Sequence, residues 1–72
     1  MRKSMVMNGL GVLSMKIGSL VRIKQSGDPK LVGTYGLVER FVEFIEGDYV
    51  VIYRLVDGRK DSYHHTSLEV LT

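Results

Sequence analysis

The chain has no cysteine, no tryptophan and a single proline in 72 residues. Without cysteine, neither a disulfide framework nor a thiolate metal site can stabilise the fold. Without tryptophan, the chain lacks the aromatic side chain that most often anchors peptide-binding grooves. A domain this short has a small core. Its stability must therefore come from side-chain packing, from closure of a sheet or from a partner.

The sequence also lacks a strong excess of charge of one sign. The chain has ten Lys and Arg residues, and removing Arg2 and Lys3 leaves eight from Met15 onward, which the eight Asp and Glu residues balance. A phosphate-binding surface usually has a net excess of cations. A nucleic-acid partner is therefore not favoured by charge.

Long hydrophobic runs are missing as well. Residues 1–14, MRKSMVMNGLGVLS, combine two cations with a short apolar run that Asn8, Gly9 and Gly11 interrupt. The run is too short to span a bilayer and no small-x-small cleavage site follows it. We expect residues 1–14 to form an N-terminal arm, either flexible or docked on a partner or a neighbouring subunit, and we expect no membrane association.

Residues 15–72 have the pattern of an all-β domain. Five short strands are predicted at residues 19–25, 34–44, 49–55, 59–64 and 68–71, with a helical turn at 65–67 and turns at 27–29 and 46–48. Asp57-Gly58 is the strongest local hairpin signal. Adjacent apolar pairs on both sides of Glu39-Arg40 predict a β-bulge there. Closure of so small a sheet would remove its open edges, which predicts a strongly bent barrel.

The segment 18–23, GSLVRI, followed by Gly27, Lys30, Gly33 and Gly36, resembles the strand-loop-strand pattern of KOW-type and SH3-like barrels. The segments 49–58 and 68–71 look like the second half of the same barrels. The resemblance covers about residues 16–71, and the compact layout is most similar to uncharacterised accessory proteins of tailed phages. It implies a small five-stranded SH3-like barrel located in the host cytoplasm or in a virion.

No constellation of residues indicates an enzyme or a cofactor. His64 and His65 are adjacent, and adjacent residues on a strand point to opposite faces, so the two cannot easily bind one ion. The hydroxyls near them are not part of a G-x-S-x-G elbow. The glycines at 27, 33 and 36 lack the Lys-Ser/Thr of a phosphate loop. We expect neither catalysis, nor a metal site, nor a cofactor.

Residues 49–55, YVVIYRL, are apolar at nearly every position. If Tyr49, Val51, Tyr53 and Leu55 form the inner face, then Val50, Ile52 and Arg54 point outward. An outward pair of Val50 and Ile52 beside Leu37 or Phe41 would be an exposed apolar patch, and such patches tend to mark protein interfaces. The alternative is that the corner of the barrel covers these side chains.

These observations predict a non-enzymatic protein-docking module that binds a larger protein or assembly, or a second copy of itself, as a phage accessory or structural protein would. The alternative is a KOW-like module that binds RNA or DNA. Four basic residues could then line a phosphate-contacting stripe: Arg22, Lys24, Lys30 and Arg59.

Overall fold

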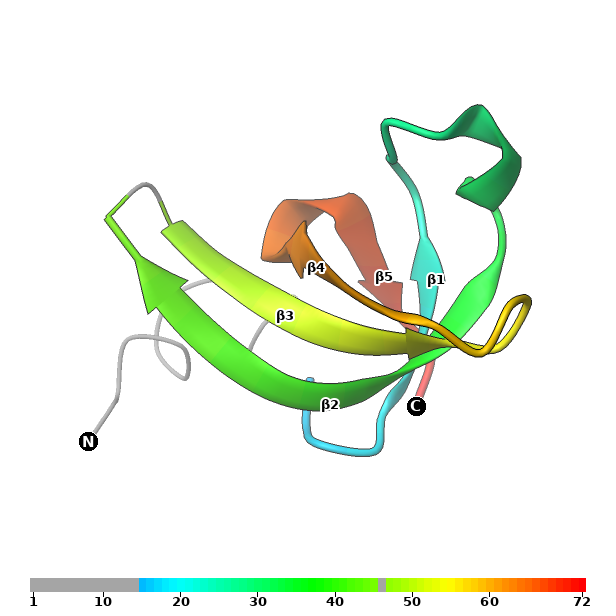
Figure 1. The fold of residues 1–72 in the computed structure, drawn as a ribbon. Helices are drawn as coiled ribbons and strands as arrows, with labels where there is room; N and C mark the ends of the chain where they lie inside the picture. Colours follow the sequence, from blue (N-terminus) through cyan, green and yellow to red (C-terminus); the bar gives the residue numbers. More distant parts are fainter. Residues whose placement is uncertain (1–14, 46) are drawn as a thin grey trace.

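The computed structural model describes residues 15–45 and 47–72, which form one antiparallel sheet of five strands (Figure 1). The strands are β1 (Leu20–Ile23), β2 (Tyr35–Phe44), β3 (Gly47–Arg54), β4 (Lys60–His64) and β5 (Leu68–Val70). Two short 3-10 helices, η1 (Pro29–Leu31) and η2 (His65–Ser67), connect β1 to β2 and β4 to β5. The predicted all-β class is confirmed, and the prediction about residues 1–14 lies outside the described residues. No described helix is long and apolar enough to span a membrane.

The order of the strands is β4-β3-β2-β1-β5, so β4 and β5 are the two edges. The first residues of β2 pair with β1, and β2 pairs with β3 from Gly36 to Phe44. Figure 1 shows β2 and β3 curving together while β1 and β5 cross one end of them. The two edge strands do not pair with each other in the described part of the chain, and the sheet is therefore open rather than a closed barrel.

Several local predictions can be compared directly with the strands. The β-bulge is confirmed, because Val38 pairs with Ile52 while Arg40 pairs with Val51, which leaves Glu39 as the extra residue. The helical turn at 65–67 is confirmed as η2.

Two turns differ from the prediction. Gly47 and Asp48 belong to β3 rather than to a turn, because Gly47 pairs with Phe44. Strand β3 ends at Arg54, whose backbone N–H donates to Arg59 and whose carbonyl accepts from Gly58. Residues 55–58 therefore form a four-residue loop that ends with Gly58 at a φ of 69°, which glycine adopts without strain.

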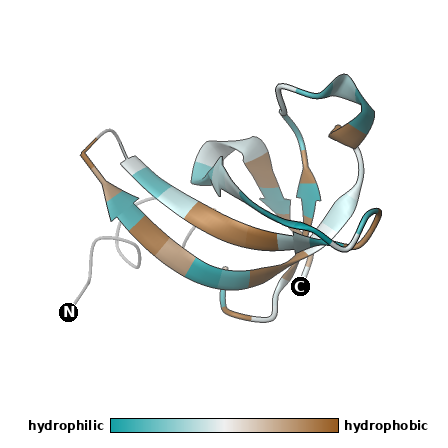
Figure 2. Cartoon of the chain, viewed as in Figure 1, coloured by the Kyte–Doolittle hydropathy of each residue, from teal (hydrophilic) through white to brown (hydrophobic). Residues whose placement is uncertain are grey.

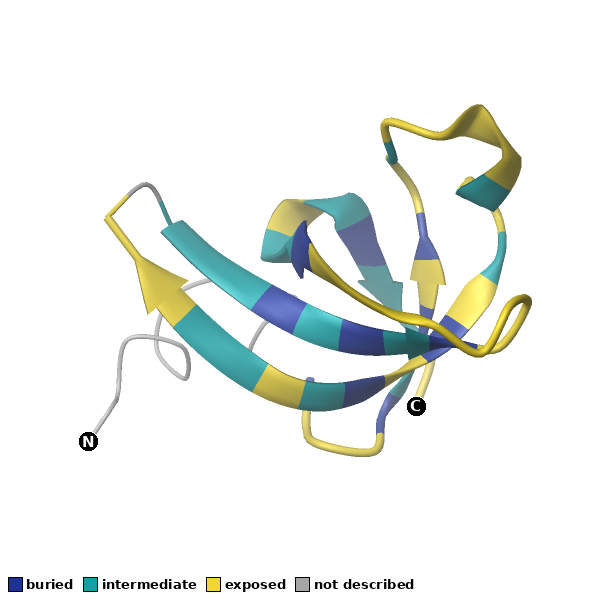
Figure 3. Cartoon of the chain, in the orientation of Figure 1, coloured by how far each residue is buried: buried dark blue, intermediate teal, exposed yellow. Residues whose placement is uncertain are grey.

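The core consists of alternate residues of the strands and a few residues beside them. Along β3, Val50, Ile52 and Arg54 are buried while the residues between them are partly exposed (Figure 3). Figure 2 shows the same stretch as the most hydrophobic part of β3. Full burial of each aliphatic side chain contributes about 1.5–3 kcal/mol. The buried hydrophobic residues are Met15, Val21, Ile23, Val38, Val50, Ile52, Tyr63 and Leu68.

Gly36 lies where β2 passes from one neighbour to the other. It is paired with Val21 of β1 on one side and with Arg54 of β3 on the other. A Cβ atom at this position would overlap Cγ2 of Ile52 and lie 2.9 Å from the carbonyl oxygen of Tyr53. Glycine is therefore required here so that β3 can approach β2 closely.

We predict that Gly36→Ala lowers the free energy of unfolding by about 1–3 kcal/mol, because the added methyl group must displace Ile52 and the backbone of Tyr53. Urea denaturation followed by circular dichroism measures this change. Gly27→Ala is the matched control, since a Cβ there meets no atom within 4 Å. Equal stabilities of the two variants would contradict the close approach at Gly36.

Candidate functional site

Two residues of the predicted apolar patch lie on the core side of β3 rather than on its solvent side. Val50 and Ile52 are both 0% exposed and belong to the core, so the expectation that they point outward is wrong. Phe41 packs against the same core, whereas Leu37 is 36% exposed. Because nearly every residue of the segment 49–55 is apolar, the sequence did not distinguish the two faces. The alternative that the fold covers these side chains holds for Val50 and Ile52.

The side chains between the buried ones form an outward surface, which we call the outer strand face. Directly paired residues of antiparallel strands share a face, so the pairs Leu37–Tyr53, Arg40–Val51 and Val42–Tyr49 lie together on the side away from the core. Lys60, Ser62 and His64 continue these rows on β4. Most of the apolar members are half-buried by their neighbours. The apolar and aromatic residues of the outer strand face are Leu37, Val42, Phe44, Tyr49, Val51, Tyr53 and His64, and its polar residues are Arg40, Lys60 and Ser62.

Aromatic rings are concentrated where the β2–β3 hairpin ends. Phe44 and Tyr49 meet edge to face with their ring centroids 5.0 Å apart, and Tyr49 meets His64 in the same way at 5.2 Å. Phe44 is 52% exposed, and the adjacent Ile45 is fully exposed. Edge-to-face contacts hold the rings in fixed positions. The hairpin therefore presents an ordered apolar surface to solvent.

Arg54, at the end of β3, is a buried cation that sequence reasoning placed outside. Its side chain is 10% exposed and binds Asp57 through two hydrogen bonds, from Nε to Oδ1 at 3.1 Å and from Nη2 to Oδ2 at 2.9 Å. Nη1 donates to Oδ2 of Asp61 at 3.2 Å and to the hydroxyl of Tyr63 at 3.1 Å. These bonds join the β3–β4 loop and β4 to the core.

The contacts between Arg54 and Asp57 favour the charged form of both side chains. The hydrogen bonds from Arg54 lower the pKa of Asp57, and the backbone N–H of Arg59 adds to the effect. The pKa of Arg54 is raised in turn, chiefly by Asp57 and Tyr63, so it stays charged at every accessible pH. The spacing of two aspartates and a tyrosine at three, seven and nine residues after an arginine was the signal in the sequence that could have revealed this cluster.

The four basic residues of the nucleic-acid alternative do not form one stripe of free cations. Nη2 of Arg22 lies 2.7 Å from Oε1 of Glu69, which compensates its charge. Lys24, Lys30 and Arg59 are exposed and make no ion pair with other described residues. Lys24 follows the end of β1, Lys30 is in η1 and Arg59 precedes β4, so three of the four predicted cations lie outside the strands.

The histidines have structural partners. Nδ1 of His64 lies 2.8 Å from the hydroxyl of Thr66 and accepts from its backbone N–H, which caps η2. The ring of His65 stacks on that of His64 at 4.7 Å. Burial first and the neighbouring His64 second lower the pKa of His65, while Asp48 opposes the shift. The described residues contain no group of three or more His, Asp or Glu side chains able to hold a metal ion.

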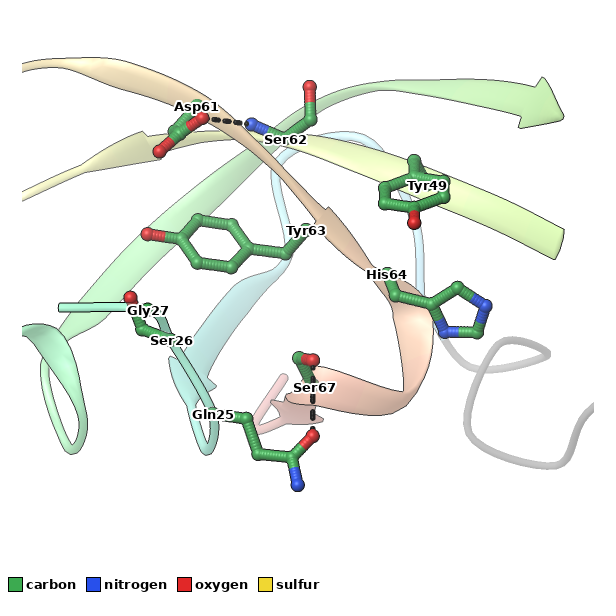
Figure 4. Close-up of a pocket in the computed structure, with 9 residues that line it drawn as sticks. All are labelled: Gln25, Ser26, Gly27, Tyr49, Asp61, Ser62, Tyr63, His64 and Ser67. Carbon is green, nitrogen blue, oxygen red and sulfur yellow. Dashed lines mark hydrogen bonds between the residues drawn. The ribbon is translucent and has the colours of Figure 1, made fainter. Parts of the chain in front are cut away.

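A polar pocket of about 440 Å³ lies between β4 and the loop after β1 (Figure 4). Its polar groups already bind one another: Ser67 donates to Gln25, the N–H of Ser62 donates to Asp61, and Asp61 also accepts from Arg54. No hydroxyl of the lining is bonded to His64, the imidazole that Figure 4 shows at its rim. The pocket offers hydrogen bonds to a ligand rather than an activated nucleophile.

A second depression, which we call the turn pocket, lies where the β1–β2 connection meets the β3–β4 loop. It has a volume of about 350 Å³. Three large apolar side chains line it and remain exposed, namely Tyr35 at 45%, Leu55 at 51% and Val56 at 58%. The remaining lining residues are Gly33 and Thr34. The sequence did not indicate this pocket, because the prediction placed Leu55 in a strand rather than in a loop.

We predict that Arg54→Met lowers the free energy of unfolding by about 2–3 kcal/mol, since it leaves two aspartates and a buried tyrosine hydroxyl without their partner. Chemical denaturation measures the loss. Arg40→Met, a matched change at an exposed arginine of β2, should leave stability nearly unchanged. If the Arg54 variant were as stable as the control, the cluster would not support the fold.

The stability of the folded chain should fall as the pH drops below 6.5. A lowered pKa means that folded His65 binds a proton less readily than the unfolded chain does, so protonation favours unfolding in the window below the ordinary value of 6.5. Asp57, whose pKa is also lowered, adds a further loss below 3.8. Thermal midpoints recorded from about pH 8 down to about pH 3 follow both losses of stability. His65→Gln should flatten the first step and leave the second intact, and an unchanged first step would assign it to another group.

No family model, curated protein or solved structure matches this chain. The outer strand face and the turn pocket, with the charges beside them, therefore carry its functional interpretation.

Proposed function

We propose that this chain is a non-enzymatic protein-docking module that binds its partner through the outer strand face. The observation that carries the proposal is the row of half-exposed apolar side chains across β2 and β3, which ends at Phe44 with 52% exposure. Contiguous apolar patches that are exposed to water on an isolated domain are typical of protein interfaces. Aromatic residues are enriched at the centre of such interfaces.

We further propose that the curved, open sheet has the strand arrangement of the SH3-like barrels. The order β4-β3-β2-β1-β5, the bulge at Glu39 and the 3-10 turn η2 before the last strand support it, since all three accompany a meander that bends back on itself. A tailed-phage assembly, the setting that the resemblance implies, is the first place to search for a partner.

Binding of RNA or DNA is the alternative function. It draws support from Lys24, Lys30 and Arg59, which are exposed and make no ion pair with another described residue, but Arg22 is compensated by Glu69. A labelled oligonucleotide at low ionic strength distinguishes the two functions, because binding to phosphates weakens steeply with added salt.

We predict that Phe44→Lys abolishes association while costing less than about 1.5 kcal/mol of stability, because the ring is half exposed and loses mainly its contact with Tyr49. Sedimentation velocity measures self-association. A photo-crosslinking amino acid at position 44 captures another partner from a lysate of the source cells, and the band is identified by mass spectrometry.

Leu71→Lys provides the matched control, since it places the same charge on an apolar residue of similar exposure, 42%, next to the β5 edge. The control should associate like the unmodified chain. Equal association by the Phe44 and Leu71 variants, or a chain that stays monomeric and yields no crosslinked partner, would contradict docking through the outer strand face.

A further inference from the structure

We propose that the free edge of β4 binds an extended, uncharged segment of a partner polypeptide as an additional strand of the sheet. The site is an edge of the sheet rather than its outer face, so the inference goes beyond the proposed docking function. Among the described strands, only β3 pairs with β4. The polar pocket lies along the free side of β4, because the consecutive residues 61–64 of this strand line it.

The pairing of β3 with β4 fixes which backbone groups of β4 are free. Tyr53 lies opposite Lys60 in this ladder, and Arg54 and Arg59 continue the register. The N–H of Arg54 donates to the carbonyl of Arg59 at 2.8 Å, so these two residues form a hydrogen-bonded pair. Such pairs alternate along antiparallel strands with pairs that exchange no bonds. The residues at 60, 62 and 64 therefore direct their backbone N–H and C=O groups away from β3.

Ser62 shows how the free edge is satisfied while no partner strand is present. Its N–H donates to Oδ1 of the neighbouring Asp61 at 2.9 Å. The other carboxylate oxygen of Asp61 accepts from Arg54, so this side chain is already held in place. A carbonyl oxygen of an added strand can replace the carboxylate as acceptor, and the N–H groups at 60 and 64 gain acceptors in the same way.

The opposite wall of the polar pocket determines the width of what can enter. Gln25, Ser26 and Gly27, in the loop after β1, lie across the pocket from β4 (Figure 4). An added strand lies about 4.8 Å from its neighbour in a sheet. A wall on the far side of the pocket favours a single extended segment over the edge of a second folded sheet.

The side chains around the edge favour an uncharged segment. The two ionised residues of β4 already have partners, since Lys60 lies 3.1 Å from Glu39 and Asp61 is paired with the buried guanidinium. Ser67 and Gln25 line the pocket and share one long hydrogen bond of 3.4 Å. A charged side chain would lose hydration here without meeting an unpaired counter-ion among the lining residues. Short hydroxyl side chains can instead form hydrogen bonds with the lining.

Fluorescence polarisation with defined peptides tests the proposal. The probes are four labelled heptapeptides: alternating threonine and serine, the same peptide with every backbone nitrogen methylated, and two peptides with glutamate or lysine in place of the serines. We expect the threonine-serine peptide to bind most tightly. The methylated peptide should bind at least about tenfold more weakly, since it cannot donate hydrogen bonds to the edge of β4.

Two variants at one position assign the binding to β4. Ser62→Pro removes the N–H at the centre of the free edge, and proline is tolerated on an edge strand where its nitrogen faces away from the neighbouring strand. This variant should weaken binding of the threonine-serine peptide by about tenfold. Ser62→Ala keeps the N–H and should bind like the unmodified chain. Phe44→Lys, at the outer strand face, should also bind the peptide normally.

Amide hydrogen exchange, followed by NMR on the unmodified chain, locates the bound peptide without any substitution. We expect the N–H groups of Lys60, Ser62 and His64 to exchange more slowly when the threonine-serine peptide is present. This measurement decides the proposal if the proline variant does not fold.

Four outcomes would overturn the proposal: no detectable binding, equal binding of the methylated and unmethylated peptides, equal binding by folded proline and alanine variants, or slowed exchange only outside β4. Self-association that the proline variant abolishes and the peptide does not displace would show that the edge serves a second copy instead, and would also overturn it. If the edge fails while association through Phe44 persists, the docking function stands unchanged.

Discussion

The buried guanidinium of Arg54 is the interaction on which the rest of the fold depends. Burial of a charge is unfavourable unless partners surround it, and the aspartates at 57 and 61 together with the tyrosine at 63 supply them. Their positions in the loop and on β4 mean that the cation fixes the β3–β4 hairpin at one geometry. Arg54 lies on the same face of β3 as the buried Val50 and Ile52, and the outer strand face is the opposite side of this strand.

Much of the fold could be predicted from the sequence. The strand periods, the bulge at Glu39 and the turn at 65–67 are local signals, and each was readable from a few neighbouring residues. The face of β3 was not, because the six apolar or aromatic residues of the segment 49–55 show no period of two, and Arg54 was expected to point toward water. Pairing with Phe41, Tyr63 and the aspartates settled that face, and those contacts are visible only in the folded chain.

The outer strand face and the turn pocket share one physical origin. A chain this small has too few residues to cover both faces of its sheet. Several aliphatic side chains of β2 and β3 are buried in the core on one face. The second face keeps aromatic and aliphatic residues that no other described element covers. The positions of the candidate site could not be predicted, because the apolar residues of the segment 49–55 are shared between the core and the outer strand face.

Pairing of β1 with β5 has a consequence for the order in which the chain can fold. Leu20 donates to a hydroxyl 52 positions further along the chain, at Thr72, whereas β2, β3 and β4 pair only with their sequence neighbours in a meander. Distant contacts form late because loop closure must precede them. During synthesis the meander of β1 to β4 can assemble first, and β5 can pair with the free edge of β1 only when residues 68–72 have left the ribosome.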